Sequence, residues 1–316
     1  MNDKQWDFNR QTTADQVVAG LDLKGKVVLI TGANKGLGYE TARALASAGA
    51  KVLLSCRNLE AGAQAVAKIK LNHSHAQVER VLLDLASLSS VRTLCQALSE
   101  RPDIPQLDVL ICNAGSMLSK NGETEEGFEQ TIGVCHIGHF YLTKLLMPLL
   151  QAAPAPRVVM VSSNGHKTPK TLDFSTLGLP QKNSEYTSME AYGQAKLCNI
   201  LMAKELQHRY GNSGLTACAM DPGMVVTDMA TKSNSAMIRF IFKWLGFLIK
   251  GPDQGAATIV LCAIASNAEK IAAGYFINCQ PKACSAEASN PAVAKQLWAL
   301  SEQWIGDVET NYAQSQ

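Results

Sequence analysis

The sequence predicts a single α/β domain built on a doubly wound parallel sheet of about seven strands, with helices on both faces. Short apolar runs alternate with longer segments of helical periodicity, and strands separated by helices in this way pair in parallel. The runs Val27–Thr31 and Arg157–Ser162 contain continuous apolar stretches, as expected for parallel strands that are buried on both faces. Neither an internal repeat nor a linker divides the chain, so we expect one domain.

Seven segments carry the strand pattern: Val27–Thr31, Lys51–Ser55, Gln77–Leu83, Val109–Cys112, Arg157–Ser162, Thr216–Met220 and Gly274–Asn278. Crossover helices fit between the first six, and helical periodicity is clear in four segments: Gly38–Ala48, Ser89–Ser99, Glu129–Leu150 and Ala191–Tyr210. We expect residues 25–316 to form the domain and residues 1–24 to form an N-terminal extension. A second addition, residues 228–252, is rich in Met, Phe and Trp, and we expect it to be a lid over the binding site.

The composition excludes some classes of function. The 316 residues carry 29 basic and 27 acidic side chains, a net charge of +2, which argues against a nucleic acid as the main partner. The nine cysteines form no Cys-x-x-Cys pair. We therefore expect buried, reduced thiols rather than a disulfide framework or a metal site.

No segment has the pattern of a signal peptide or a transmembrane helix. The first residues are polar, and the apolar stretch 236–249 is too short to span a bilayer and is interrupted by Arg239 and Lys243. Together with the reduced thiols, this pattern favours a cytoplasmic location. The amphipathic stretch leaves peripheral contact with a membrane surface open.

Directly after the first strand, a glycine-rich turn leads into a helix. It reads Gly32-Ala-Asn34-Lys35-Gly36-Leu37-Gly38. Glycines at such a junction let the backbone approach a pyrophosphate, which then lies at the helix N-terminus. A plain turn could use the same glycines, but the strand before and the helix after them favour a dinucleotide-binding loop.

The end of the second strand indicates which dinucleotide binds. Enzymes that select NAD(H) usually place a carboxylate there for the ribose hydroxyls, whereas this strand runs into Arg57 and Asn58. Arg57 can pair with a 2′-phosphate, and Lys35 lies in the adjacent loop, so the sequence favours NADP(H) over NAD(H). An arginine that is merely solvated at the surface is the alternative.

Two further strand ends carry candidate cofactor contacts. Asp84 and Leu85 close the third strand, where Asp84 could bind the adenine amino group or could instead cap the following helix. After the fourth strand, small residues would let the backbone pass close to the cofactor ribose, although a turn without a ligand would look the same. These residues are Asn113, Ala114 and Gly115.

Tyr192 and Lys196 are the best candidates for catalysis. They lie four residues apart on a predicted helix and therefore share one face of it. A free tyrosine has a pKa of about 10 and is a poor base at neutral pH, and a neighbouring ammonium favours the phenolate. Ser163, at the end of the fifth strand, could hydrogen-bond a substrate oxygen or simply cap a turn.

The order of these motifs, completed by Asp221-Pro222-Gly223, resembles that of the short-chain dehydrogenase/reductase (SDR) family over residues 10–305. Four stretches resemble the branch of the retinol dehydrogenases and the WW-domain-containing oxidoreductase: Thr12-Thr-Ala-Asp with Gly25-Lys-Val-Val, Cys135-His-Ile-Gly-His-Phe-Tyr-Leu-Thr, Lys196-Leu-Cys-Asn-Ile-Leu and Leu297-Trp-Ala-Leu-Ser-Glu. The resemblance implies a single-domain Rossmann-type fold and an oxidoreductase that uses a nicotinamide cofactor.

The resemblance also implies roles for single residues. Ser163, Tyr192 and Lys196 would form a catalytic triad, and Lys196 would also contact the nicotinamide ribose. The nicotinamide would be flanked by four residues: Pro222, Gly223, Val225 and Thr227. Homodimers or homotetramers formed through the long helices are usual in the family.

Cys135 departs from the family pattern. Family members usually have an asparagine at this position, which supports a water-linked proton relay from the lysine, and a thiol is a weak hydrogen-bonding group. Either water, His136 or His139 takes over this task, or turnover is slow. Packing and helix hydrogen bonding are the more ordinary roles for both histidines.

The sequence thus predicts an NADP(H)-dependent oxidoreductase that interconverts a carbonyl and an alcohol. The apolar lid suggests a small lipophilic substrate such as a retinoid, a steroid or a fatty aldehyde. Two alternatives stay open. One is an enzyme like protochlorophyllide reductase, which resembles this chain in Asp84-Leu-Ala-Ser-Leu and Gly127-Phe-Glu, and the other is a regulatory protein that binds NADP(H) with little turnover.

Overall fold

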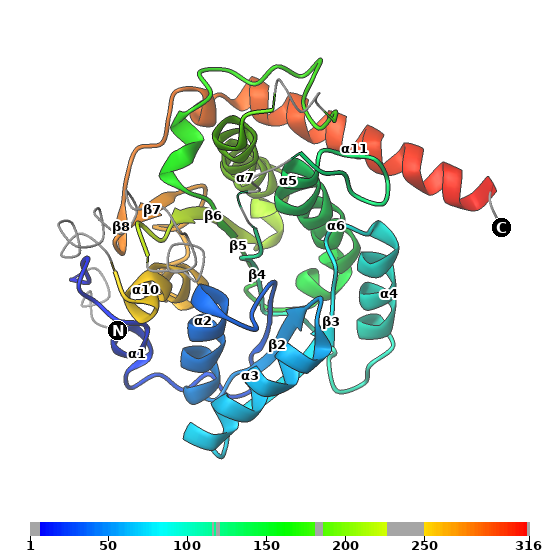
Figure 1. The fold of residues 1–316 in the computed structure, drawn as a ribbon. Coiled ribbons are helices and arrows are strands. Elements are labelled where there is room, and N and C mark those ends of the chain that lie inside the picture. The colour runs from blue at the N-terminus through cyan, green and yellow to red at the C-terminus, as the bar shows by residue number, and fades with distance from the viewer. Residues whose placement is uncertain (1–6, 116, 118–120, 181–185, 226–249, 315–316) are drawn as a thin grey trace, which may run out of the picture.

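A single sheet with helices on both faces organises the protein (Figure 1). The computed structural model describes residues 7–115, 117, 121–180, 186–225 and 250–314. The strands are β1 (Val27–Ile30), β2 (Lys51–Cys56), β3 (Gln77–Leu82), β4 (Val109–Cys112), β5 (Arg157–Val161), β6 (Thr216–Asp221), β7 (Tyr275–Ile277) and β8 (Gln280–Pro281). Their order is β3-β2-β1-β4-β5-β6-β7-β8, so the direction of winding reverses between β1 and β4, where ligands bind in such sheets. The predicted doubly wound fold is confirmed.

The sheet has eight strands, whereas the sequence predicted about seven. The additional strand, β8, pairs antiparallel with β7, and all other neighbours are parallel. Asn278 and Cys279 connect the two strands, and both have positive φ angles, of 57° and 62°. This is the backbone of a tight two-residue hairpin. The strand was missed because it is only two residues long and ends in a proline.

Two hydrophobic cores lie against the two faces of the sheet. The helices that pack into one core are α1 (Ala14–Val18), α2 (Gly36–Ser47), α3 (Leu59–Asn72) and α10 (Pro252–Ile264). Those that pack into the other are α4 (Leu88–Ser99), α6 (Gly138–Gln151), α7 (Ser188–Tyr210) and α11 (Pro291–Gln314). The helices α2, α4 and α7 coincide with predicted segments to within a few residues at their ends.

The segment predicted as one helix over Glu129–Leu150 is divided into three parts. A short α5 (Gln130–Ile132) is followed by a π-helical turn (Gly133–Ile137) and then by α6. At Gly138 a Cβ atom would lie 2.5 Å from the Leu85 carbonyl oxygen, so the backbone of α6 passes very close to the turn after β3. Wider turns of this kind often occur near functional sites.

Residues 1–24 were expected to form an extension, and among the described residues of this segment α1 packs against α2 and α10. Thr13 caps this helix, because its hydroxyl accepts from the Gln16 N–H while the Gln16 side chain accepts from the Thr13 N–H. Ala14, Val17 and Val18 are buried in the core formed with α2 and α10.

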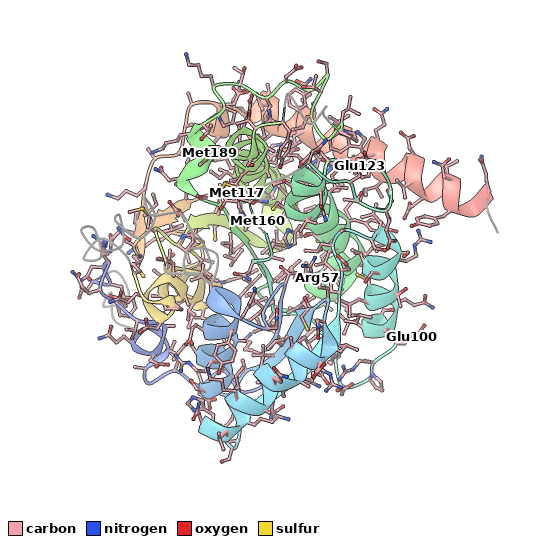
Figure 2. All side chains as sticks on the ribbon, in the orientation of Figure 1. Arg57, Glu100, Met117, Glu123, Met160 and Met189 are labelled. Carbon is pink, nitrogen blue, oxygen red and sulfur yellow. The ribbon has the colours of Figure 1, made fainter. Side chains whose placement is uncertain are left out.

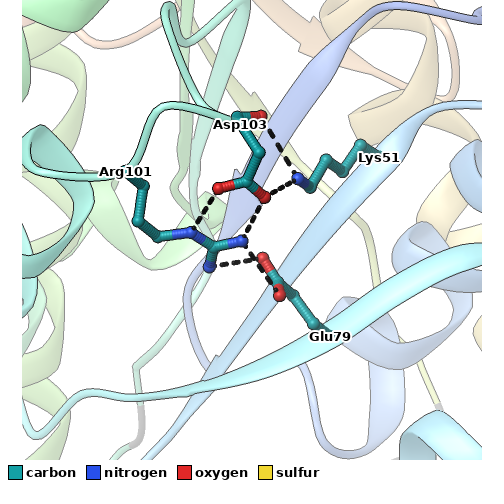
Figure 3. Close-up of polar contacts among 4 residues, drawn as sticks. All are labelled: Lys51, Glu79, Arg101 and Asp103. Carbon is teal, nitrogen blue, oxygen red and sulfur yellow. Dashed lines mark hydrogen bonds and ion pairs between the residues drawn. The ribbon is translucent and has the colours of Figure 1, made fainter.

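At the amino edge of the sheet, four charged side chains join the first strands (Figure 3). Lys51 begins β2, and its Nζ lies 2.5 Å from Asp103 Oδ2. The Arg101 guanidinium lies 2.6 Å from the same oxygen and 2.7 Å from Glu79 Oε1 on β3. Ion pairs this close to solvent contribute little stability. This network joins the loop before β4 to β2 and β3 at the amino edge of the sheet.

Arg157, the first residue of β5, is buried and holds the end of α10. Its guanidinium donates to the carbonyl oxygen of Cys262 at 3.1 Å and to that of Ala265. Cys262 lies in the last turn of α10 and Ala265 directly follows the helix, where carbonyls have no N–H of a following helical turn to accept from. Burial lowers the pKa of the Arg157 guanidinium, so the two carbonyls compensate a desolvated charge.

Arg157→Leu is expected to lower the free energy of unfolding by about 1–3 kcal/mol, because two buried carbonyls lose their donor. Urea denaturation would measure the change. The matched control is Lys144→Leu, which removes a lysine from a more exposed pair with Glu302 and should cost less than about 1 kcal/mol. Equal losses in both variants would contradict the role given to Arg157.

Candidate active site

The residues predicted from the sequence gather at the carboxyl edge of the sheet. The loops that follow β1, β4, β5 and β6 lie at this edge, because parallel strands end on the same side. Figure 2 labels Arg57 after β2 and Met117 after β4, both on this side, and Glu100 at the far end of α4. Thr227 and the predicted lid up to residue 249 lie outside the described residues.

The glycine-rich turn after β1 has the backbone that its sequence predicts. Gly32 and Gly36 have φ angles of 64° and 60°, which favour glycine. At Gly38 a Cβ atom would lie 2.6 Å from Asn113 Nδ2 and 2.7 Å from the Gly32 carbonyl oxygen. Gly38 therefore lets α2 pack directly on the loops after β1 and β4.

The start of α2 suits a phosphate. Side chains cap α1, α3 and α4, whereas Lys35 gives no side-chain hydrogen bond to the first turn of α2. That turn contains no acidic residue, and a Cβ atom on Gly36 would meet nothing within 4 Å. The first N–H groups of a helix favour an anion, so this turn fits a pyrophosphate. Asn34 is half-buried in the turn, and Leu37 packs on the core beside it.

Two of the predicted cofactor residues near the adenosine end have structural contacts as well. Asn58 caps α3, because its Oδ1 accepts from the Ala61 N–H at 2.9 Å. The Asp84 Oδ1 accepts from the Ala86 N–H, whereas Ser87 is the residue that caps α4. The alternative that Asp84 caps the helix is therefore wrong.

Arg57 and Leu85 differ in exposure. Arg57 is exposed directly after β2, at the carboxyl edge. Leu85 is buried, and its carbonyl oxygen and Cβ face Gly138 on α6. Arg57 thus lies where a charged ligand can reach it, while the Leu85 side chain serves packing.

Thr31 holds the loop formed by Asn113, Ala114 and Gly115. Its hydroxyl oxygen accepts from the Asn113 N–H at 2.9 Å and from the Ala114 N–H at 2.8 Å. The Asn113 side chain donates in return to the Thr31 carbonyl at 2.8 Å. Thr31 was not among the predicted site residues, although a hydroxyl at a strand end next to the glycine-rich turn is a signal for such a role.

Lys196 is buried beside Tyr192. Its side chain is 3% exposed, and its Nζ donates to the Val161 carbonyl at 2.8 Å and lies 5.5 Å from the centre of the Tyr192 ring. A Cβ atom on Gly115 would lie 3.1 Å from this Nζ, so the glycine leaves room for the lysine. Ser162 donates to the Lys196 carbonyl at 2.7 Å and ties α7 to the end of β5.

Ser163 caps a short 3-10 helix, Asn164–Lys167, that packs against Tyr192. Its Oγ accepts from the Gly165 N–H at 3.2 Å, which leaves the hydroxyl hydrogen to donate elsewhere. A Cβ atom on Gly165 would lie 3.3 Å from the Tyr192 ring and 3.6 Å from Ser163 Oγ. The structure therefore brings Ser163, Tyr192 and Lys196 together.

His166 supports this loop from behind and was not predicted from the sequence. Its Nδ1 donates to the Ser163 carbonyl at 2.7 Å, and its Nε2 accepts from the Ser285 N–H at 3.2 Å. The ring is fully buried, and burial lowers its pKa, so the neutral form is favoured. No local pattern signals a contact between residues 119 positions apart.

The turn after β6 brings Pro222 and Gly223 to the same edge. The buried Asp221 accepts from the Gly223 N–H at 2.8 Å, and Gly223 has a φ angle of 80°. Val225 forms an isolated parallel β-bridge with Lys250. The Lys250 side chain is buried next to Gly223. Because β6 lies next to β5 in the sheet, this turn follows the same edge as the loop after β5, and Val225 packs near Gly255 at the start of α10.

Cys135 and the two histidines that follow it are buried in the π-helical turn and at the start of α6. His136 bonds to Ser301 at 2.8 Å, and burial lowers the pKa of the imidazole to about 3. For His139 burial lowers the pKa to about 4. Both rings are hydrogen-bonded inside the protein, as the more ordinary interpretation predicted.

All nine cysteines are free thiols, and eight of them are buried. In the part of the chain that the structure describes, no group of three or more His, Cys, Asp or Glu side chains could hold a metal ion. Within the same residues, no helix is both long enough and apolar enough to cross a membrane.

Several known proteins are similar to this chain in sequence and fold. A family model described as short chain dehydrogenase matches residues 26–172, which include the glycine-rich turn, Asn113 and Ser163. Relatives more than 30% identical match over nearly the whole chain, so the chain belongs to the short-chain dehydrogenase/reductase family and is an oxidoreductase.

The individual relatives confirm the predicted branch. The chain is 41% identical to the WW domain-containing oxidoreductase of Gallus gallus, over 94% of this chain and 72% of that protein. It is 38% identical to retinol dehydrogenase 11 of Homo sapiens, over 90% of this chain and 87% of that protein. A solved structure of an uncharacterized protein from Mycobacterium paratuberculosis has a TM-score of 0.72 and 34% identity, covering 91% of this chain and 96% of that one.

Gly38→Ala is expected to destabilise the protein and to weaken NADPH binding, because its Cβ would displace the Asn113 side chain or the Gly32 carbonyl. The matched control is Gly306→Ala in α11, where a Cβ would meet nothing within 4 Å. That change should stabilise the helix by about 0.5–1 kcal/mol. Thermal unfolding and NADPH titration would measure both variants. Equal behaviour of the two would contradict the close packing at Gly38.

Proposed function

We propose that the protein is an NADP(H)-dependent oxidoreductase that interconverts a carbonyl and an alcohol on a small lipophilic substrate, using Ser163, Tyr192 and Lys196. The observation that carries the proposal is the buried Lys196 ammonium, 5.5 Å from the Tyr192 ring centre, with the Ser163 loop packed on the same ring. A buried cation beside a tyrosine stabilises negative charge on the phenolic oxygen.

In the direction of reduction, the substrate oxygen would accept hydrogen bonds from the Ser163 and Tyr192 hydroxyls. NADPH, when bound, supplies the hydride that adds to the carbonyl carbon. The C=O π bond breaks as Tyr192 gives its phenolic proton to the oxygen, so one C–H and one O–H bond form. Lys196 stabilises the phenolate that remains on Tyr192 until solvent protonates it again.

NADP(H) fits the residues that the chain presents for it. The uncapped first turn of α2 and the open space at Gly36 suit the pyrophosphate. Arg57 is exposed after β2 and suits a 2′-phosphate. Residues that would hold the remainder are Asp84, Asn113, Ala114, Gly115, Tyr192, Lys196, Pro222, Gly223 and Val225.

Exposed methionines support a lipophilic substrate. Met117 follows the Asn113–Gly115 loop, Met189 lies one turn before Tyr192 on α7, and Met224 follows Gly223, and all three are exposed. Methionine side chains adapt to varied apolar shapes. The relative from Homo sapiens bears the name retinol dehydrogenase 11, which makes a retinoid the first substrate to test.

Tyr192→Phe is expected to lower kcat by about 100-fold or more, because it removes the proton donor and leaves the ring in place. The assay follows NADPH consumption with all-trans-retinal, a steroid ketone and a long-chain aldehyde. Tyr210→Phe, at the other end of α7, is the matched control and should keep the wild-type rate.

A wild-type rate in Tyr192→Phe would contradict the proposed mechanism. If the wild-type protein binds NADPH but reduces none of the three substrates, the low-turnover regulatory protein becomes the better interpretation.

Arg57→Gln is expected to raise the Kd for NADPH by about 10- to 100-fold and to leave the Kd for NADH unchanged, because only the 2′-phosphate loses a charged partner. Fluorescence titration with both cofactors would measure this. Arg101→Gln, at the amino edge of the sheet, is the control for loss of a charge. An equal loss for NADPH and NADH would contradict the role of Arg57.

A further inference from the structure

Besides accepting from two backbone N–H groups, the Thr31 hydroxyl has two possible acceptors. It lies 3.4 Å from the Ile111 carbonyl oxygen on β4 and 2.8 Å from Nε2 of His139 on α6. Thr31 is fully buried, and His139 is 1% exposed. The histidine thus reaches from the helix α6 to the strand end that holds the Asn113–Gly115 loop.

The direction of each hydrogen bond around His139 follows from its partners. Its Nδ1 lies 3.1 Å from the Cys135 carbonyl oxygen, which can only accept, so Nδ1 carries the hydrogen. Burial and the nearby Lys196 charge lower the pKa of His139 to about 4, so the ring is neutral and Nε2 accepts. Thr31 therefore donates its hydroxyl hydrogen to Nε2, and its oxygen can accept from Asn113 and Ala114.

The Cys135 carbonyl extends this chain of bonds to the catalytic helix. It also accepts from the Asn199 side-chain Nδ2 at 2.7 Å. Asn199 is buried on α7 one turn after Lys196, so the two side chains lie on neighbouring positions of the same helix. A continuous, buried series of hydrogen bonds thus runs from Asn199 through His139 and Thr31 to the backbone of Ala114.

We infer that His139 is a positioning residue for the reaction, which sets the distance between the catalytic helix and the loop at Asn113–Gly115. This inference rests on the proposed function. The neutral His139 ring donates through Nδ1 to the Cys135 carbonyl and accepts through Nε2 from the Thr31 hydroxyl. Without it, the Thr31 hydroxyl would keep only the more distant Ile111 carbonyl, at 3.4 Å, as an acceptor, and the Asn113–Gly115 loop would lose its link to α6 through Thr31.

His136 provides a matched control. It precedes His139 by three residues, is buried to the same degree, and is neutral for the same physical reason. Its Nε2 bonds to Ser301 on α11, away from the loop at Asn113–Gly115. Loss of either histidine removes a buried ring and a hydrogen bond, but only His139 contacts Thr31.

The experiment compares His139→Asn with His136→Asn. The asparagine amide can replace Nδ1 but does not reach Thr31. We expect His139→Asn to raise the Kd for NADPH about tenfold and to speed amide hydrogen exchange at Asn113 and Ala114 about tenfold relative to His136→Asn. His139→Gln, whose amide reaches the Nε2 position, should restore most of both.

Equal effects of the two asparagine variants on NADPH binding and on exchange at Ala114 would overturn the inference. If His139→Asn does not fold, His139→Phe is compared with His136→Phe, because the phenyl ring keeps much of the buried volume and removes both ring nitrogens. In that pair, only His139→Phe should weaken NADPH binding and speed exchange at Ala114, and equal results would overturn the inference.

Hydrogen exchange needs no substrate, so it separates this inference from the proposed function. A wild-type protein that reduces no carbonyl would count against the proposed function alone. Faster exchange at Ala114 in His139→Asn than in His136→Asn would still support the positioning role.

Discussion

The arrangement of the candidate active site depends on the buried ammonium of Lys196. A charge removed from water is costly unless neighbouring groups compensate it, and here the Val161 carbonyl accepts one of its hydrogens at 2.8 Å. The contact joins α7 to the end of β5, and Ser162 adds a second bond between them. Gly115 leaves the space that the ammonium occupies, so the loop after β4 must also lie close by.

Close backbone contacts at two glycines bring helices against the loops at the carboxyl edge of the sheet. Gly38 lets α2 pack against Asn113, and Gly138 lets α6 pack against the turn after β3. Buried polar groups then set the spacing between these parts: His166 behind Ser163, and Thr31 with His139 behind Ala114. Each of these groups is hydrogen-bonded, as buried polar groups must be. The glycines permit the contacts, and the polar groups hold them in one geometry.

Features that follow from short-range sequence patterns could be predicted, whereas contacts between residues far apart in the sequence could not. The spacing of Tyr192 and Lys196, the glycine turn and most strands follow from short-range patterns. His166 meets Ser285 only through the fold. Asn58, predicted as a cofactor residue, caps α3, and Ser87 rather than Asp84 caps α4. The break in the helix over Glu129–Leu150 was also missed, because π-helical turns have no clear sequence signal.

The most direct test of the role of Lys196 is a crystal structure of the protein with NADPH bound. We expect the pyrophosphate at the first turn of α2, the 2′-phosphate at Arg57, and the nicotinamide ribose within hydrogen-bonding distance of Lys196 Nζ. The Lys196 bond to the Val161 carbonyl should persist. A cofactor bound elsewhere, or a Lys196 side chain that leaves Val161 and contacts neither Tyr192 nor the ribose, would contradict this expectation.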